Sequence, residues 1–341
     1  FLFSLQAEYY DIIHILLIKV SKSIFRYIFF YIGISMASYN SIAQQSPRST
    51  LSTYHQMTYN PSIVGNTKYG NIQTVVREQY MNFSDNSGPS SVWFNASVPL
   101  SKLQSGVGIT INQLQQGFEK RLDFKANYAY HIDLGSGKFG AGLSIGGRNI
   151  GWDIKNPIYP DGQNDAFVDT KIANKENFVN LLVGFGVYYK VNNIFTSLAI
   201  TEMNKPKLQT EGSKVEYYNR TYWLSAGYEL KTSNPMWIIK PGVLVKTTIT
   251  DTQLNFDMIT EYNNFIIAGL TYTSSHDISP IFGVQFNDGS KFDGLRAIIS
   301  YDIVTSKIGA QSSGNMEFTV GYNFNLSVEK ENKTYKSVRF L

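Results

Sequence analysis

Residues 122–134 read LDFKANYAYHIDL, and apolar and polar side chains alternate along this stretch with hardly a break. Successive side chains of a β-strand point to opposite faces, so the stretch predicts a strand with one apolar and one polar face. It is about twice as long as a common strand of a soluble protein and long enough to cross a bilayer at a tilt. Because similar stretches recur along the chain, the sequence predicts an all-β fold, a transmembrane antiparallel β-barrel of the outer-membrane type.

The composition agrees with a membrane barrel. The 341 residues include no cysteine, 14% aromatic residues and only 16% charged residues, whereas soluble domains carry about 25% charged residues. A barrel cannot expose charge to lipid, and its rims collect aromatic side chains. The formal net charge of +4 is too small and dispersed to indicate a nucleic-acid partner. The slightly negative mean hydropathy excludes a polytopic helical membrane protein.

The N-terminal region has the outline of a secretory signal peptide. Lys19, Lys22 and Arg26 precede an apolar run over residues 27–37, and small residues then predict cleavage near Ala43. A transmembrane anchor is the alternative, but the run is shorter than the roughly 20 residues that a helical span needs. The first methionine is Met36. We therefore expect residues 1–43 to comprise upstream residues plus the signal peptide, with translation starting near residue 17 or 20.

Alternating stretches predict about fourteen strands, and the barrel is expected over residues 70–326. The expected strands are 70–79, 90–99, 106–115, 121–134, 138–150, 177–190, 193–202, 219–231, 236–249, 252–262, 264–274, 279–288, 291–302 and 315–326.

The connections between these strands fall into two groups. Short turns are expected at 135–137, 191–192, 232–235, 263 and 287–290, and long connections at 151–176, 203–218 and 303–314. Outer-membrane barrels have short periplasmic turns and long outer loops, which predicts both chain ends in the periplasm. Residues 44–69 and 327–341 would then be periplasmic segments, or the N-terminal stretch would enter the lumen. A soluble β-sandwich with a signal peptide is the alternative fold.

The polar face of the predicted strands carries charges of both signs. These residues are Arg77, Asp123, Lys125, His131, Arg148, Lys190, Glu229, Lys240, Lys246, Asp257, Glu261, Arg296 and Glu317. They could line a pathway, form a socket for a polar segment, or fill the lumen with salt bridges. The last is the simplest expectation, because every barrel has a polar interior.

Catalytic and cofactor motifs are weak, so we expect no enzyme activity and no cofactor. His276 lies beside Asp277 and follows Ser274-Ser275, but outer loops are rich in these residue types. The stretch 135–138, GSGK, lacks the first glycine and the final hydroxyl residue of a phosphate-binding loop and predicts a hairpin turn. Four oxygen-bearing residues of one long loop could bind calcium, although loop acids are usually just solvated: Asp161, Asn164, Asp165 and Asp169.

Short motifs at both ends of the mature chain resemble a known family. Residues 59–65, YNPSIVG, resemble the "NPAYAG" opening of the PorP/SprF family of type IX secretion outer-membrane proteins of Bacteroidetes. Residues 77–83 resemble its R-x-Q-W-x-x-F motif with Tyr80 in place of Trp, and residues 313–317, SGNME, resemble its S-G-S-H-E. The matching positions are Asn60, Pro61, Gly65, Arg77, Gln79, Tyr80, Phe83, Gly88, Pro89 and Glu317.

The backbone and side-chain properties of some motif residues suggest structural roles. Pro61 and Gly65 would fix a bend before the first strand, because proline sets φ and glycine permits positive φ. Arg77 and Gln79 share the lumen parity and could hold a loop or the N-terminal segment by hydrogen bonds. Plain packing of the wall is the alternative.

The resemblance implies a fourteen-strand outer-membrane barrel that assists secretion or surface attachment of a secreted cargo. The expected partners are a cargo, often adhesin-like, with a type IX C-terminal sorting domain, other type IX secretion components and outer-membrane lipid. A general porin is the alternative. Cargo contact is expected on the long outer loop near 151–176, whose apolar residues include Trp152, Ile158, Tyr159 and Phe167.

Overall fold

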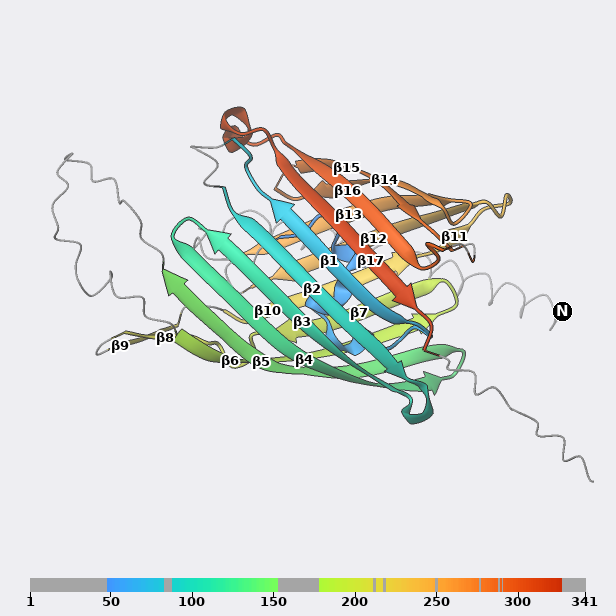
Figure 1. The fold of residues 1–341 in the computed structure, drawn as a ribbon, viewed down its shortest axis with the longest axis horizontal. Helices are drawn as coiled ribbons and strands as arrows, with labels where there is room; N and C mark the ends of the chain where they lie inside the picture. The colour runs from blue at the N-terminus through green and yellow to red at the C-terminus, as the bar shows by residue number, and fades with distance from the viewer. Residues whose placement is uncertain are drawn as a thin grey trace, which may run out of the picture. The chain divides into compact units, whose positions relative to one another are not determined.

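The computed structural model describes residues 48–82, 88–152, 178–210, 213–216, 219–248, 251–275, 277–287, 289 and 291–326. Its contacts divide the chain into two units, Phe1–Ala43 and Gln44–Leu341, and every described residue belongs to the second. In this described part, antiparallel strands run side by side around a closed ring (Figure 1). Strand β1 pairs with both β2 and β17, and β10 closes the other half by pairing with both β7 and β12.

The wall of the described barrel has fourteen strands, as the sequence predicted, when the short β11 is taken as the continuation of β10. The wall strands are β1 (Gly70–Glu78), β2 (Ser90–Leu100), β3 (Ser105–Gln116), β4 (Glu119–Leu134), β5 (Gly137–Trp152), β6 (Phe178–Val191), β7 (Ile194–Thr201), β10 (Thr221–Tyr228) with β11 (Leu230–Lys231), β12 (Trp237–Thr247), β13 (Thr252–Tyr262), β14 (Ile266–Thr273), β15 (Asp277–Gln285), β16 (Leu295–Val304) and β17 (Asn315–Phe324).

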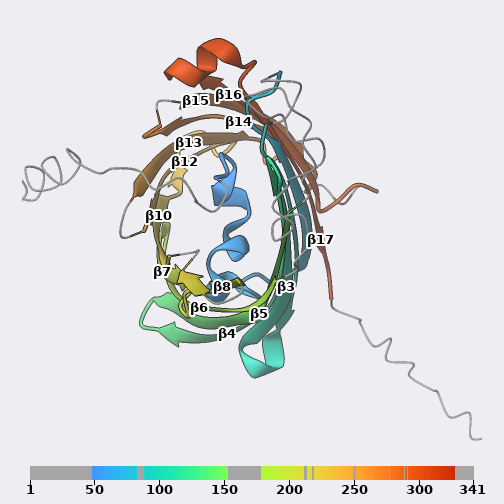
Figure 2. The same ribbon diagram turned by 90° about the vertical axis from the view of Figure 1, so that its left-hand side faces the viewer.

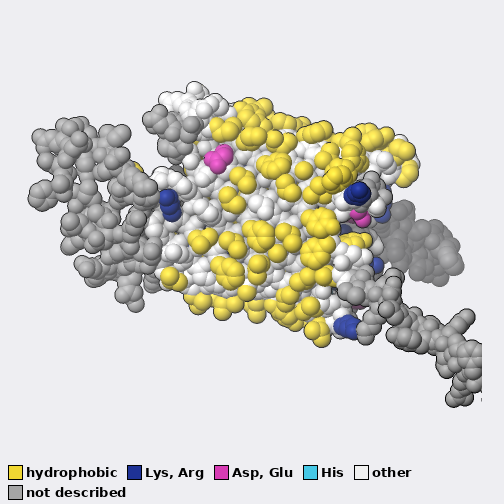
Figure 3. All heavy atoms as spheres, viewed as in Figure 1, with side chains coloured by type: hydrophobic (Ala, Val, Ile, Leu, Met, Phe, Trp, Pro, Cys, Tyr) yellow, Lys and Arg dark blue, Asp and Glu magenta, His cyan; other side chains and the backbone are white. Residues whose placement is uncertain are grey.

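The alternation of β4 sorts its side chains as expected. Phe124, Tyr128 and Tyr130 are exposed on the outside of the wall, whereas Asp123 and Asn127 are buried on the lumen side. The outer surface in Figure 3 is accordingly rich in apolar side chains, and its few visible charges lie towards the two ends. Such an apolar band between polar rims is the surface that a membrane barrel presents to lipid.

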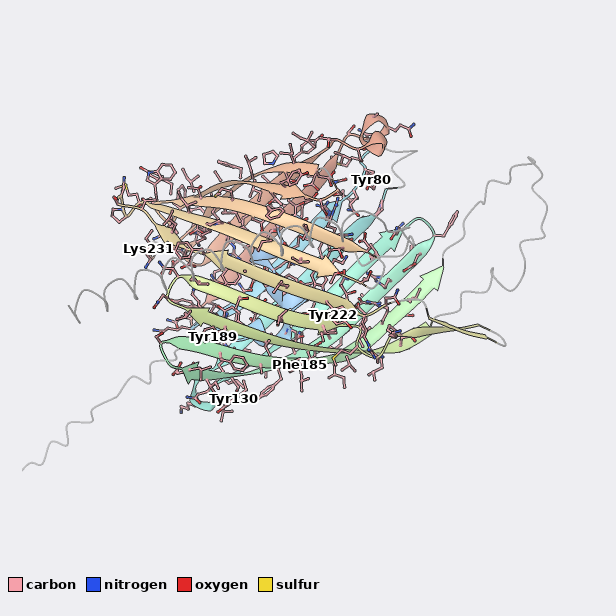
Figure 4. The ribbon with its side chains drawn as sticks, turned by 180° about the vertical axis from the view of Figure 1, so that it is seen from behind. Tyr80, Tyr130, Phe185, Tyr189, Tyr222 and Lys231 are labelled. Atoms are coloured by element: carbon pink, nitrogen blue, oxygen red, sulfur yellow. The ribbon has the colours of Figure 1, made fainter. Side chains whose placement is uncertain are left out.

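The short turns that the sequence predicted share one end of the barrel, which we call the inner end. The strands flanking the predicted long connections meet the other, outer end, which also carries short connections such as the two-residue turn between β3 and β4. Gly135, Asn192, Asn263 and Asn264 have positive φ, the conformation that tight hairpin turns require. Tyr130, Tyr189 and Lys231 lie near the inner rim and Tyr80 near the outer rim (Figure 4). No helix of the described residues is long and apolar enough to cross a membrane.

Two features of the outer connections were not predicted. The connection after β7 contains a separate hairpin of β8 (Lys207–Thr210) and β9 (Ser213–Glu216), and a 3-10 helix, η5 (Lys307–Gln311), follows β16. The connection between β5 and β6 lies outside the described residues.

The segment before β1, residues 48–69, lies inside the ring of strands; we call it the plug (Figure 2). It contains three short 3-10 helices, η1 (Ser52–Tyr54), η2 (Gln56–Thr58) and η3 (Pro61–Ile63); a fourth, η4 (Ser101–Leu103), joins β2 to β3. Leu51 packs against Ile259, Ile267, Ile281 and Ile298 of the wall, and these five side chains form an apolar core within the lumen. The described part of the N-terminal segment therefore lies in the lumen, the second of the two placements that the sequence allowed, and not in the periplasm.

Candidate functional site

The plug crosses the lumen from the outer end to the inner end. Arg48 binds Ser275 and Asp277 where β14 meets β15 at the outer end. At the inner end, His131 Nε2 lies 2.8 Å from the carbonyl oxygen of Val64. The next residues lead directly into β1, so the plug is covalently tied to the wall at the inner end and held by side chains elsewhere.

Several polar contacts of the plug surround one buried arginine of β1. Arg77 is fully buried; its Nη2 donates to Asp302 Oδ2 over 2.6 Å and its Nη1 to Glu317 Oε2 over 2.9 Å. Thr50 Oγ1 accepts from Arg77 Nη1 over 3.0 Å and donates to Asp302 Oδ1 over 2.8 Å. We call Arg77, Asp302, Glu317 and Thr50 the Arg77 cluster.

The plug backbone completes the Arg77 cluster. The N–H groups of Thr50 and Leu51 donate to the two carboxylate oxygens of Glu317 over 2.9 and 3.1 Å. The wall sets two carboxylates, Asp302 and Glu317, against one arginine. The plug backbone therefore provides N–H donors for carboxylate oxygens that Arg77 alone does not pair. A buried carboxylate costs several kcal/mol unless its oxygens are paired, so the closed barrel depends on the plug for part of this pairing.

In the inner half of the lumen, wall glycines make room for the plug backbone. A Cβ built on Gly142 would lie 2.5 Å from the Pro61 carbonyl carbon, and one on Gly186 would lie 2.1 Å from Asn60 Oδ1. Gly65, with a φ of +70°, approaches Gly106 so closely that its own Cβ would lie 2.5 Å from the Gly106 Cα atom. We call Gly106, Gly142 and Gly186 the glycine seat.

The local sequence explains why η3 forms in this seat. Asn60 Oδ1 accepts from the Ser62 N–H over 3.0 Å, and Pro61 occupies the first helical position. Asparagine is a preferred N-cap, and proline at the first position sacrifices no helical hydrogen bond. Asn60 and Pro61 thus both favour a sharp turn that fits between the glycines.

Between these two ends, aromatic contacts hold the middle of the plug. Tyr59 stacks on Trp223 with ring centroids 4.8 Å apart, and His55 stacks on Trp93 at 5.6 Å. Lys125 Nζ donates to the carbonyl oxygen of Thr58 over 2.8 Å. The plug is therefore held along its whole described length.

A second charged cluster lies on the other side of the lumen. Arg148 donates to Asp123 through two nitrogens, over 2.7 and 2.8 Å, and to Glu202 Oε1 over 2.9 Å. Arg121 Nε lies 3.9 Å from Asp123 Oδ2. A cavity of about 70 Å³ separates this cluster from the plug; we call it the lumen cavity.

The motif residues occupy three places. Arg77 and Glu317 meet in the Arg77 cluster, while Asn60, Pro61 and Gly65 lie at the glycine seat. The other described motif residues shape the outer rim: Gln79 N–H donates to Pro89 O over 2.9 Å, Tyr80 N–H donates to Asn315 Oδ1 over 2.9 Å, and Gly88 packs on the Gln79 carbonyl. Phe83, Ile158, Tyr159 and Phe167 lie outside the described residues, as do His276 and the four candidate calcium ligands, and the Trp152 side chain is not described.

Several residues of these clusters were not predicted from the sequence. Asp302 and Arg121 lie on the lumen parity of predicted strands and could have been found by extending the alternation by one step. Glu202 follows β7 with a positive φ, off the strand alternation, and Thr50 belongs to a segment without periodicity. Nothing in the sequence marked these two.

The contacts among Ser49, His55 and Glu317 do not have the geometry of a catalytic triad. Ser49 Oγ lies 2.5 Å from His55 Nε2, but Glu317 accepts from Ser49 and does not orient the other ring nitrogen, which contacts Thr58 Oγ1 at 3.1 Å. All of Ser49, His55 and Glu317 are buried. Nucleophilic catalysis needs a base oriented by a third group and an accessible hydroxyl. Among the described residues, no group of three or more His, Cys, Asp or Glu could hold a metal ion.

Comparisons with known proteins give one strong match. The model of the family described as "Type IX secretion system membrane protein PorP/SprF" matches residues 41–322. No curated protein matches the chain.

Among solved structures, the toluene transporter TodX of Pseudomonas putida is 10% identical over 78% of this chain and 92% of its own, with a TM-score of 0.47. Omp33 of Acinetobacter baumannii is 7% identical over 76% of this chain and 100% of its own, with a TM-score of 0.44. Likenesses this weak carry no argument about the activity of this chain.

Proposed function

The chain belongs to the PorP/SprF family of type IX secretion system membrane proteins and is an outer-membrane β-barrel, and we propose that it assists secretion or surface attachment of one specific partner cargo. The cargo would be a secreted, adhesin-like protein with a type IX C-terminal sorting domain, and other components of the secretion system would be further partners. The family match, which spans residues 41–322, carries this proposal.

The plug favours this role over that of a general porin. A porin needs a water-filled pathway through its lumen, whereas here residues 48–69 cross the lumen and are held at the Arg77 cluster, at Trp223 and at the glycine seat. A barrel closed in this way suits a protein that holds or positions a partner at its outer end. In this proposal the protein is not an enzyme.

Solute flux through the purified barrel separates the two roles. Liposomes containing the protein should swell in small sugars little faster than protein-free liposomes, and far more slowly than liposomes that contain a known general porin. Swelling as fast as with the general porin would contradict the proposal and favour the porin.

We place cargo contact on the outer connection between β5 and β6. Its sequence sets Trp152, Ile158, Tyr159 and Phe167 among polar residues, a mixture common on recognition surfaces. β5 and β6 pair from Gly137 and Val191 at the inner end to Ile150 and Phe178 at the outer end, so the connection leaves and re-enters the wall at the outer end.

A loop deletion in the native host tests this placement. Removing residues 161–175 should abolish cargo retention at the cell surface and leave heat-modifiable gel mobility of the folded barrel unchanged. Removal of η5 (Lys307–Gln311) is the matched control on another outer connection and should leave surface cargo unchanged. If surface cargo persists after the first deletion while solute permeability rises, the loop is a cap and the placement is wrong.

A further inference from the structure

A broad apolar groove lies on the outside of the wall, over β1–β6 and near the inner end. One ladder of directly paired, outward residues runs along it from strand to strand: Ile72, Ala96, Ile109, Ala126, Ile145 and Val183. The groove has a volume of about 830 Å³, within the range of about 300–1,000 Å³ that is common for small-molecule sites. We call it the wall groove.

Small residues of this ladder explain the hollow. On β4, Ala126 stands between the larger outward side chains of Phe124 and Tyr128, which are both exposed. A methyl group between two rings leaves a depression, because alternate residues of a strand lie next to one another on one face. Figure 3 shows this side of the wall, where apolar side chains continue towards the inner end. In an outer-membrane barrel such a surface faces acyl chains, so the groove suits an apolar chain.

A polar pocket lies at the inner rim beside the wall groove. Tyr128 lines the groove, and Tyr130, the next residue on the same face of β4, donates its hydroxyl to Gln104 Oε1 over 3.3 Å. Gln104 in turn lines a pocket of about 270 Å³, which we call the rim pocket. The wall groove and the rim pocket are therefore one side chain apart along the outer face of the wall.

The rim pocket has the charge and the donors of an anion site. Lys68 and Lys138 line it together with one acid, Asp133. Among the described residues neither lysine forms an ion pair, and Lys138 Nζ donates to a backbone carbonyl of the plug over 3.5 Å. Ser101 and Gln104 are exposed in the lining and add neutral donors. A phosphodiester, which carries a single negative charge, would balance the second lysine.

Tyr130 indicates the depth of the rim pocket in the membrane. It lies near the inner rim (Figure 4), and tyrosines of membrane proteins collect at the level of the lipid headgroups. The wall groove begins one step deeper, on the hydrocarbon side. Because the sequence predicts that the inner end faces the periplasm, the pocket and the groove match the headgroup and the chains of a lipid in the periplasmic leaflet.

We propose that the wall groove and the rim pocket together bind one phospholipid of the leaflet at the inner end. Its acyl chains lie in the wall groove along Ala96 and Ala126, and its phosphate accepts hydrogen bonds from Lys68 and Ser101 in the rim pocket. Lys68 belongs to the plug and Ser101 to η4, so the headgroup joins the plug to the wall. This lipid site is independent of the cargo that the barrel serves.

Native mass spectrometry of the detergent-purified protein tests the site. Dioleoylphosphatidylglycerol should bind as one molecule per chain. Dioleoylglycerol, which has the same chains and no phosphate, should bind about tenfold more weakly, because it loses a charge-assisted hydrogen bond. Inorganic phosphate at the same concentration should not displace the phospholipid.

Three results of this experiment would overturn the proposal. Failure to bind the phospholipid would remove the site. Equal binding of dioleoylglycerol would show that the rim pocket does not hold a phosphate. Displacement by inorganic phosphate would show that the wall groove does not hold the chains.

Two tryptophan substitutions on the outer face provide a matched pair for the wall groove. Ala126→Trp fills the groove and should abolish phospholipid binding. Ala268→Trp, exposed on the outside of β14 and away from the groove, should leave binding unchanged. Equal binding by both variants would refute the groove assignment. A dimer mass that Ala126→Trp alone removes would assign the groove to a second copy of the chain instead.

Two lysine substitutions at the inner rim provide the matched pair for the rim pocket. Lys68→Gln should weaken phospholipid binding about tenfold. Lys231→Gln, near the inner rim but outside the pocket (Figure 4), should leave it unchanged, and equal affinities would refute the headgroup assignment. Heat-modifiable gel mobility confirms that each variant is folded. If Ala126→Trp does not fold, Ala96→Leu adds less bulk to the same ladder and should still weaken binding.

Discussion

The plug contacts two charged regions of the lumen, the Arg77 cluster and the lumen cavity, in different ways. In the Arg77 cluster, Asp302 and Glu317 outnumber the arginine, and the plug backbone packs against them with two N–H donors. At the lumen cavity, Arg148 binds Asp123 and Glu202 of the wall side, and a cavity of about 70 Å³ lies between these side chains and the plug. One region is packed directly against the plug backbone, and the other keeps a cavity beside the plug.

This difference follows from the sequence of the plug. A segment without acids can donate backbone N–H groups to carboxylates but cannot neutralise arginine and lysine. We therefore expect loss of Arg77 to destabilise the barrel more than loss of Arg148, which lies beside the lumen cavity. Three substitutions, taken from the largest expected effect to the smallest, can break or sharpen this contrast.

Arg77→Met should have the largest effect. It would leave Asp302 and Glu317 buried with no cation, and breaking a buried pair in this way costs about 3–5 kcal/mol. Urea unfolding of the micelle-bound protein, followed by tryptophan emission, measures the loss. Lys190→Met is the control, because its pair with Glu229 is 3.7 Å long and partly exposed and should contribute only about 0–1 kcal/mol.

Arg148→Met should cost less, about 1–3 kcal/mol, although Arg148 also binds two carboxylates. Asp123 keeps Arg121 as a neighbour at 3.9 Å, and the adjoining cavity can admit water to the carboxylates. The same urea series measures this variant. A loss as large as that of Arg77→Met would erase the contrast between the two regions.

Thr50→Val should have the smallest effect of the three, about 1–2 kcal/mol, by removing one hydroxyl that bridges Arg77 and Asp302 while keeping the shape of the side chain. Thr67→Val provides a control in the same segment, because its hydroxyl donates to Tyr69 O at an exposed position. Stability equal in both variants would mean that the plug does not support the Arg77 cluster.

The sequence predicted the strands of the wall better than it predicted the plug inside the lumen. Alternation placed Phe124 outside and Asp123 inside, and it gave the number of strands, because a two-residue period is imposed by the backbone itself. It could not reveal that Gly142 and Gly186 lie beside Pro61 and Asn60, since that contact depends on barrel closure and on a segment without periodicity. Arg77 was a candidate anchor for the plug, but Asp302 and Thr50 join it only through strand register.

The family motifs mark the plug and its anchors more than the wall. Asn60, Pro61 and Gly65 belong to the plug, and Arg77 and Glu317 bind its outer part. We infer that these motif residues hold the plug in the lumen. The β8–β9 hairpin had no signal of this kind, because its strands are only four residues each.

An engineered disulfide tests the central claim, that the N-terminal segment occupies the lumen, most directly. The chain has no cysteine, and the Asn60 Cγ atom lies 3.0 Å from the position of a Cβ on Gly186, within reach of a disulfide. Asn60→Cys combined with Gly186→Cys should crosslink in the outer membrane, seen as a faster band on a non-reducing gel of the boiled protein that reverts on reduction. Asn60→Cys combined with Phe185→Cys, whose side chain is exposed on the outside of the same strand, should not crosslink. Absence of the first crosslink in correctly inserted protein, or equal crosslinking of both pairs, would contradict a plugged barrel.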